Sequence, residues 1–181
     1  MRIISGNLKG RRLQVPSNLP VRPTTDFART GIFNVMANHF DFGEVRVLDL
    51  FSGTGGMTFE FISRGCGSIE AVDNNYHCVK FIRDTAVKFG VENVKVHKAA
   101  ASAFMRNTEQ QYDIIFADPP YNRLEILHLP MLAFERNLVA PGGWFILEHQ
   151  SVHDLKGMPH YKDKRVYGNV GFSIFANEEN A

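Results

Sequence analysis

The sequence predicts an α/β fold with a mostly parallel sheet of seven strands. Short runs of β-branched and apolar residues alternate with stretches whose apolar residues recur at helical spacing. This alternation implies right-handed strand–helix–strand units and a sheet covered on both faces. The last two strand-like runs are separated only by Gly168-Asn169, which predicts an antiparallel hairpin.

The individual elements follow from the apolar pattern. Parallel strands are expected at 45–51, 68–73, 94–97, 112–117 and 144–149, and the hairpin strands at 165–167 and 171–175. Helices are expected at 57–65, 75–89, 99–107 and 124–138. Gly90 marks the end of the second helix, Pro130 marks a kink or a new start in the last, and 141–143 reads as a turn.

The first forty residues differ from this pattern. Residues 3–4 and 13–15 can pair as a short hairpin through 6–10, and a helix then begins after Thr24 or Thr25 as N-cap. Gly31 inside that helix predicts a close packing contact, because glycine costs about 1 kcal/mol relative to alanine there. We therefore expect an amino-terminal extension at 1–40 and one compact domain at 41–181.

Composition narrows the class of protein. The chain has 181 residues, a net charge of +1 and two cysteines outside any CxxC arrangement, so neither a disulfide framework nor a zinc site is expected. No apolar run reaches the roughly 20 residues that span a bilayer, and the first residues lack the apolar core of a signal peptide. We expect a cytoplasmic protein without a membrane partner.

The small net charge hides an uneven distribution. Residues 1–30 carry +5 and the remainder carries −4. A basic arm on a mildly acidic body predicts a polyanionic partner, although a solvated basic surface would look the same. The basic residues assigned to nucleic-acid binding are Arg2, Lys9, Arg11, Arg12, Arg22, Arg29, Lys164 and Arg165.

A glycine-rich turn follows the first parallel strand and predicts a ligand site. Gly53 and Gly55 allow positive φ and close approach of a ligand, and Asp73 ends the next strand, where a carboxylate suits a ribose diol. Thr58 stands where a dinucleotide fingerprint has its third glycine, and Asp49 would repel a pyrophosphate. S-adenosylmethionine, which has an amino group, a sulfonium and a ribose but no phosphate, fits better than NAD.

The fourth strand ends in Asp118-Pro119-Pro120-Tyr121, which predicts a site for an exocyclic amine. The prolines fix φ and remove two N–H groups, so the Asp118 carboxylate and the Pro119 carbonyl offer two adjacent acceptors. Two acceptors can hold both hydrogens of an –NH2 group, and Tyr121 can stack on a base, a contact worth about 1–3 kcal/mol. A rigid turn without chemistry is the alternative.

These residues resemble the class I S-adenosylmethionine-dependent methyltransferases of exocyclic nitrogens, a Rossmann-like fold. Over nearly the whole chain they are similar to the bacterial RsmD-type family of small-subunit rRNA guanine-N2 methyltransferases. The likeness lies in RIISGNLKGRRLQVP, in RPTTD with Arg29 and IFN, in VLDLFSGTGGMTFEFISRG, in FADPPY and in the closing VYG. DPPY by itself is shared with DNA adenine methyltransferases.

The resemblance implies transfer of a methyl group to N2 of one guanine of 16S rRNA, guanine 966 in the family, presented in an assembling or assembled small ribosomal subunit. It implies catalytic roles for Asp118, Pro119, Pro120 and Tyr121, and adds Tyr167 to the RNA-binding set. Cofactor contacts are implied for Asp49, Phe51, Ser52, Gly53, Thr54, Gly55, Asp73, Asn74 and Asp118. Ala101 and Ser102 stand where such enzymes often carry an Asp or Asn against the adenine, so a backbone N–H near Ala101 or the Ser102 hydroxyl would serve instead.

Other functions stay open at this point. Methylation of adenine N6 or of a protein glutamine, a nucleotide-binding oxidoreductase, and a catalytically silent RNA-binding assembly factor all share part of the pattern. No histidine pair has the HExxH spacing, and no metal is expected. The oligomeric state is also open, and an enzyme that docks on a large particle can be monomeric.

Overall fold

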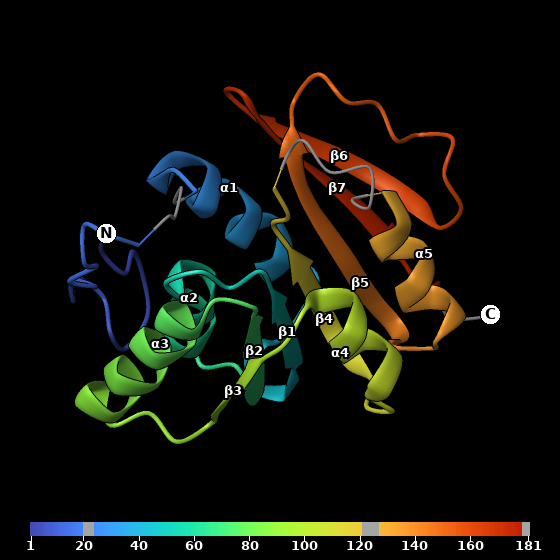
Figure 1. Cartoon of the computed structure of the whole chain (residues 1–181). Helices are drawn as coiled ribbons and strands as arrows, with labels where there is room; N and C mark the ends of the chain where they lie inside the picture. The colour runs from blue at the N-terminus through green and yellow to red at the C-terminus, as the bar shows by residue number, and fades with distance from the viewer. Residues whose placement is uncertain (20–23, 121–126, 179–181) are drawn as a thin grey trace.

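The computed structural model describes residues 1–19, 24–120 and 127–178. Its centre is a seven-stranded sheet with the strand order β3-β2-β1-β4-β5-β7-β6 (Figure 1). The first five strands run parallel, and β7 lies antiparallel between β5 and β6. The strands are β1 (Arg46–Leu50), β2 (Ser68–Asp73), β3 (Val94–Lys98), β4 (Tyr112–Ala117), β5 (Val139–Gln150), β6 (Tyr161–Tyr167) and β7 (Val170–Ala176). The predicted fold class and hairpin are confirmed.

Helices cover both faces of the sheet (Figure 1). One apolar cluster packs α1, α2 and α3 against one face, and a second packs α4 and α5 against the other. The helices are α1 (Asp26–Ala37), α2 (Gly56–Ser63), α3 (Tyr76–Phe89), α4 (Ala101–Asn107) and α5 (His128–Glu135), with a 3₁₀ turn, η1, at Phe42–Glu44. Among the described residues, no helix is both long and apolar enough to span a membrane.

Local sequence signals set the helix ends. Thr25 caps α1 by accepting a hydrogen bond from the Ala28 N–H at 3.2 Å, and Asn75 caps α3 through the His77 N–H at 2.8 Å. Gly90 ends α3 in the left-handed conformation at φ 67°, as its position predicted.

The last parallel strand begins earlier than predicted. β5 already starts at Val139, and the expected turn at 141–143 is an irregularity inside it, because the pairing with β4 shifts between Tyr112 and Ile114. The helix predicted at 124–138 is shorter where it is described, at 128–135, and Pro130 lies in its first turn, where no intrahelical N–H bond is lost.

The amino-terminal extension shares its core with the body of the protein. The predicted hairpin pairs Arg2 with Arg12 as an isolated antiparallel bridge rather than as two full strands. Ile3 and Leu13 are buried in the same apolar cluster as α1 and α2. The close contact predicted at Gly31 is confirmed, because a Cβ there would lie 2.2 Å from the Tyr167 ring.

Candidate active site

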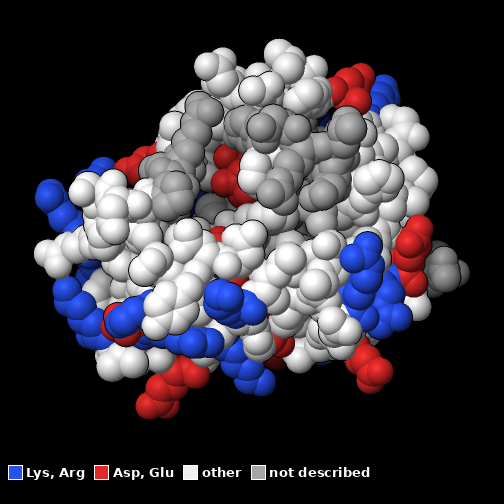
Figure 2. Space-filling view, viewed as in Figure 1, with Lys and Arg blue, Asp and Glu red and all other residues white. Residues whose placement is uncertain are grey.

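Three parallel strands, β1, β2 and β4, end at nearly the same level beside β5, which continues to Gln150, and polar residues lie together there. The register aligns Leu50 of β1 with Val72 of β2 and Ala117 of β4, and Ala117 with Leu147 of β5. The residues that follow these four are Phe51, Asp73, Asp118 and Glu148. We call Asp49, the turn 51–55, Asp73, Asp118 and Glu148 the carboxyl-end site. Figure 2 shows acidic side chains at the bottom of a hollow on this part of the surface.

The glycine turn is held by Asp73. One carboxylate oxygen accepts the Gly53 N–H at 2.8 Å, and the other accepts the Asn75 N–H at 2.8 Å. Phe51, Gly53 and Gly55 have φ values of 59°, 53° and 81°, so this short turn winds tightly between β1 and α2. Gly55 is also required for packing, since a Cβ there would lie 2.9 Å from the Phe59 ring. Each oxygen of Asp73 keeps a lone pair for a further donor such as a ribose hydroxyl.

Asp49 lies beneath this turn and is 1 % exposed. The Thr58 hydroxyl in α2 donates to its carboxylate. Burial raises the pKa of Asp49 to about 7; the Thr58 hydrogen bond opposes this, and the negative charges of Asp73 and Glu148 add to it. A buried carboxyl beside two others favours a ligand that carries positive charge.

The hydroxyl of Ser52 gives a second sign of a ligand. Its oxygen is buried and has no hydrogen-bond partner among the described residues. Native structures leave few such atoms unsatisfied, so a bound polar ligand is the natural partner. Together with the acidic surroundings and the open acceptors of Asp73, this hydroxyl fits S-adenosylmethionine, which offers an amino group, a carboxylate and a ribose.

The remaining predicted cofactor residues lie around this centre. Thr54 is buried, and Asn74 is exposed beside Asp73. Ala101 is buried and Ser102 is half-buried in the first turn of α4, close to β2 because the Ala99 N–H donates to the Asp73 carbonyl at 3.0 Å. The ends of β1 and β2 and the first turn of α4 therefore carry most of the positions that the sequence assigned to the cofactor.

The Asp-Pro-Pro turn lies next to the glycine turn. The Asp118 N–H approaches the Leu50 carbonyl at 3.4 Å, so β4 and β1 stay joined to their last residues. Asp118 is half-buried, Pro119 is buried and Pro120 is exposed. Tyr121 and Arg22 were also predicted to take part in the site, and both lie outside the described residues.

The predicted basic arm lies at the surface. Arg2, Lys9, Arg11 and Arg12 are exposed, and Arg11 also lies over the Phe89 ring at 5.0 Å. In Figure 2, Lys and Arg side chains gather along the lower left, over the amino-terminal segment and α3. These four residues are placed where a polyanion can reach them.

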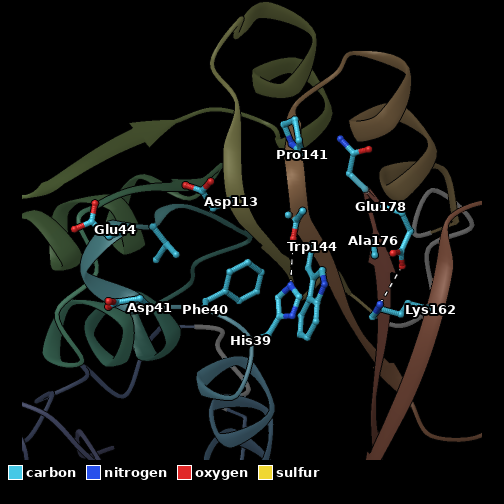
Figure 3. Close-up of a pocket in the computed structure, with 14 residues that line it drawn as sticks. His39, Phe40, Asp41, Glu44, Asp113, Pro141, Trp144, Lys162, Ala176 and Glu178 are labelled. Carbon is cyan, nitrogen blue, oxygen red and sulfur yellow. Dashed lines mark hydrogen bonds and ion pairs between the residues drawn. The ribbon is translucent and has the colours of Figure 1, made fainter. Parts of the chain in front are cut away.

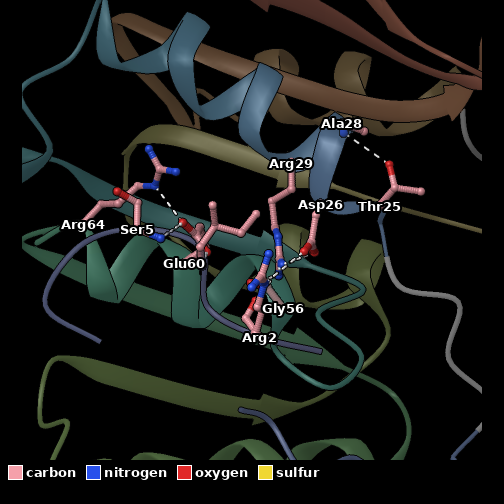
Figure 4. A network of polar contacts seen from close by, with 10 residues as sticks. Arg2, Ser5, Thr25, Asp26, Ala28, Arg29, Gly56, Glu60 and Arg64 are labelled. Atoms are coloured by element: carbon pink, nitrogen blue, oxygen red, sulfur yellow. Dashed lines mark hydrogen bonds and ion pairs between the residues drawn. The ribbon is translucent and has the colours of Figure 1, made fainter. Parts of the chain in front are cut away.

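The prediction that Arg29 contacts phosphate is wrong, because its side chain is buried. It is 1 % exposed, and its guanidinium donates to the Arg2 carbonyl at 2.7 Å, to Asp26 at 2.9 Å and to the Gly56 carbonyl at 3.4 Å (Figure 4). Gly56 is the first residue of α2. Arg29 therefore joins the amino-terminal segment to the helix that begins at the glycine turn.

The same segment is attached to α2 a second time. The buried carboxylate of Glu60 accepts the Ile4 N–H at 2.8 Å and the Ser5 N–H at 3.1 Å, and it pairs with Arg64 at 2.9 Å (Figure 4). The sequence did not single out Glu60, because within the helical pattern it looks like a residue of the solvent-exposed face.

The basic residues near the carboxyl end have local roles. The Lys164 ammonium donates to the carbonyls of Ser151 at 2.6 Å and His153 at 2.7 Å. Arg165 pairs with Asp163 at 2.7 Å while half-exposed. The Tyr167 ring packs on Gly31 and meets Phe27 edge-on at 5.6 Å. Lys164 thus fixes the segment after β5, and Tyr167 fixes α1 against the sheet.

Sequence reasoning also passed over Thr58 and Glu148. Thr58 was noted only as a departure from a dinucleotide pattern, yet it is the partner of Asp49. Glu148 falls inside an apolar strand, and it is 3 % exposed and accepts the Thr24 hydroxyl at 2.7 Å. The available signal was a charged residue within a strand whose other residues are mostly apolar.

A second hollow, of about 500 Å³, lies at the opposite end of the sheet (Figure 3). The His39 ring stacks on Trp144 at 4.3 Å, and Phe40 meets Trp144 edge-on at 5.1 Å. We call it the amino-end hollow; it is lined by His39, Phe40, Asp41, Glu44, Val45, Asp113, 141–143, Trp144, Lys162 and 176–178. No group of three or more potential metal ligands occurs in the part of the chain that is described.

The strand order and the carboxyl-end site define a class: the Rossmann-like fold of class I methyltransferases. Solved structures share this fold. A chain titled "Putative methyltransferase yhhF from Escherichia coli" aligns with a TM-score of 0.87 and 23 % identity over 99 % of both chains. A structure titled "Crystal structure of SMU.776, a putative methyltransferase complexed with SAH" aligns with a TM-score of 0.65 and 15 % identity over 82 % of this chain and 49 % of that one.

The chain belongs to the family described as conserved hypothetical protein 95, the RsmD family, whose model matches residues 1–176. A relative from Bacillus subtilis, named "Putative rRNA methyltransferase YlbH", is 31 % identical over 97 % of this chain and 98 % of its own. Ribosomal RNA small subunit methyltransferase D of Escherichia coli is 26 % identical over 98 % of this chain and 90 % of its own. The resemblance read from the sequence is confirmed.

Proposed function

We propose that this protein transfers a methyl group from S-adenosylmethionine to N2 of one guanine in the 16S rRNA of the small ribosomal subunit. The observation that carries the proposal is the alignment of Asp73, the glycine turn and the Asp-Pro-Pro turn at one level on adjacent strands. The names of the relatives support an rRNA substrate, and such a substrate agrees with the expected cytoplasmic location.

The residues of the glycine turn and its neighbours would hold the cofactor. Asp73 receives the ribose hydroxyls while it keeps its two backbone N–H bonds. Asp49 and its neighbouring carboxylates attract the amino group, and Ser52 supplies a hydroxyl that makes no hydrogen bond to any described residue. When bound, S-adenosylmethionine supplies an electrophilic methyl group.

The Asp-Pro-Pro turn would hold the amine. Asp118 and the Pro119 carbonyl accept the two N2 hydrogens of a guanine that has left its stack, and Tyr121 stacks on the ring. Guanine N2 is hardly basic, so Asp118 takes its proton after the nitrogen has become cationic. Positioning can supply about 7–11 kcal/mol of the barrier reduction.

The basic arm would hold the RNA. Arg2, Lys9, Arg11 and Arg12 are exposed on the segment that Glu60 and Arg29 attach to α2. Phosphate contacts at this surface would orient the particle relative to the carboxyl-end site, and family membership suggests guanine 966 as the target. A chain of this size would obtain selectivity from the arm, the pocket and the shape of the RNA.

Labelled methyl transfer tests the proposal. Wild-type protein is incubated with labelled S-adenosylmethionine and with 16S rRNA, either naked or in assembled small subunits. We expect label in RNA from at least one preparation, together with a thermal shift by S-adenosylhomocysteine and none by NAD. Stabilisation by NAD with no transfer to either substrate would favour an oxidoreductase instead.

A further inference from the structure

The first turn of α1 lies between the basic arm and the carboxyl-end site. Asp26, the first residue of this helix, pairs with the exposed side chain of Arg2 at 3.5 Å. Thr24, two residues before the helix, donates its hydroxyl to Glu148 of the site at 2.7 Å. An RNA that is held by the arm and places a guanine at the site would therefore pass over this turn.

Phe27 exposes an aromatic ring on the same turn. Among the described Phe, Tyr and Trp side chains, only Phe27 and Tyr76 are exposed, and Phe27 is the more exposed of the two at 69 %. A single exposed apolar side chain is common on protein surfaces, so its neighbours decide whether it can bind a ligand. The neighbours of Phe27 are the basic arm on one side and the carboxyl-end site on the other.

Tyr167 restricts the orientation of this ring. Phe27 and Gly31 are four residues apart and lie on the same face of α1, and the Tyr167 ring packs against both. It meets the Phe27 ring edge-on, with the centroids 5.6 Å apart and the planes at 87°. Such a contact covers at most one face of either ring. Phe27 therefore presents an apolar surface that is already oriented, which lowers the entropy cost of binding a ligand.

A nucleobase is a suitable ligand for such a ring. The target guanine must leave its stack to reach the site, and the bases next to it then lose a stacking neighbour. An aromatic side chain can replace that neighbour whatever the base is, because every base has a π-face. Arg2, which pairs with the residue before Phe27, supplies positive charge for a phosphate nearby.

We propose that Phe27 stacks on a base next to the target guanine and so replaces the stacking that this base loses when the guanine leaves. This inference rests on the proposed function and extends it, because it adds a surface that holds the flanking RNA. Tyr167, which the sequence assigned to RNA binding, then contributes by fixing the orientation of the Phe27 ring.

A double-mutant cycle between the ring and the base tests this. The nucleotide before or after the methylated guanine is made abasic by splinted ligation, and each RNA is presented in the form in which the intact RNA is methylated. With wild type, one of the two abasic RNAs should lower kcat/KM by about 5- to 100-fold. Phe27→Leu should lower kcat/KM on intact RNA at least about fivefold, because it keeps an apolar side chain but loses the ring. The same abasic position should then cost this variant less than about twofold.

Two further variants are the controls. Phe27→Tyr keeps the ring and should behave as wild type does. Val166 is an exposed apolar residue beside Tyr167, and alternation along β6 directs it to the opposite face of the sheet. Val166→Ala should therefore respond to both abasic RNAs as wild type does. Phe27→Leu should bind S-adenosylhomocysteine within about twofold of wild type, which shows that the fold and the cofactor site are intact.

Three results would overturn the inference. The first is a wild type that methylates both abasic RNAs as fast as intact RNA, and this comparison is decisive even if Phe27→Leu does not fold. The second is wild-type activity of Phe27→Leu on intact RNA. The third is additive losses at both abasic positions, which would assign Phe27 to a contact other than a flanking base. Absence of methylation of intact RNA by wild type would instead reject the proposed function, and the inference with it.

Discussion

The two ends of the parallel sheet use similar residue types differently. At the carboxyl ends, carboxylates are buried together, and three residues of a five-residue turn have positive φ. In the described part of the chain, the Ser52 hydroxyl there has no hydrogen-bond partner. At the amino ends, the acidic residues of the hollow make local bonds: Asp113 pairs with Arg46 at 3.3 Å, and Asp41 accepts the Gly43 N–H at 3.0 Å.

The difference separates stability from function. Charges that are already paired near solvent contribute little beyond the local fold. Burial and neighbouring carboxylates raise the pKa of Asp49 to about 7, so a positively charged ligand would stabilise its ionised form. The amino-end hollow therefore supplies matched control variants, at Asp113, Asp41 and Lys162, for tests of the carboxyl-end site and of the basic arm.

The largest expected effect comes from aspartates at the two ends of the same strand. Asp118→Ala should lower methyl transfer at least about 100-fold, because it removes the acceptor for the amine, and leave S-adenosylhomocysteine binding within a few fold. Asp113→Ala, at the amino end of β4, should retain activity. Normal turnover by Asp118→Ala on assembled subunits would remove Asp118 from the mechanism.

A smaller effect is expected on cofactor affinity. Asp73→Ala loses the bonds to Gly53 and Asn75 and the ribose contact, so the Kd for S-adenosylhomocysteine should rise about 10- to 100-fold by calorimetry. Asp41→Ala, which loses one turn bond, should bind as wild type does. Equal Kd values for the two variants would show that Asp73 contributes no more to cofactor binding than Asp41 does.

We expect Asp49 to lower the stability of the empty protein at neutral pH and to strengthen cofactor binding. Because its pKa is raised to about 7, the native state binds the proton more tightly than the unfolded chain, and wild type loses stability as pH rises from about 4 to 7. This rise in the pKa of Asp49 from 3.8 to about 7 lowers the free energy of unfolding above pH 7 by about 4 kcal/mol at most. Asp49→Asn should therefore raise Tm by several degrees at pH 8, less at pH 5, and weaken S-adenosylhomocysteine binding about tenfold.

The pH dependence of Asp49→Asn is checked by thermal scans and calorimetry at both pH values. The other carboxyls that face Asp49 are Asp73 and Glu148, and they are unchanged in the variant. A Tm gain of the same size at pH 5 and pH 8 would show that ionisation of Asp49 is not its cause.

The smallest effect per residue is expected from the basic arm. Lys9→Ala and Arg12→Ala should each weaken binding to small-subunit RNA a few fold and reduce the slope of log K against log salt by about 0.7–0.9. Lys162→Ala, in the amino-end hollow and paired with Glu178 at 3.0 Å, should leave the slope unchanged. An identical slope for all three variants would place the RNA elsewhere.

Local signals sufficed for most of the fold. The bounds of β2 and β4 and the end of α3 at Gly90 were predicted, because such signals act over a few residues. The cap of α1 was narrowed to Thr24 or Thr25, and Thr25 is the cap. The general place of the site followed too, since carboxyl ends of parallel strands meet at one edge.

Burial of charged side chains could not be predicted in this way. Arg29 looked like a surface cation because its partners, the carbonyls of Arg2 and Gly56, are 27 residues away on either side. The register of β5 with β4 places Glu148 beside Asp118, and this register depends on the irregularity at 141–143. Such contacts are set by tertiary packing and leave no periodic signal.

The most direct measurement is nucleoside mass spectrometry of 16S rRNA after reaction with wild type and S-adenosylmethionine. If the carboxyl-end site methylates a guanine amine, the digest contains N2-methylguanosine, mapped to a single nucleotide and absent with Asp118→Ala. N6-methyladenosine, or no new methylated nucleoside from either naked or assembled RNA, would contradict the central claim.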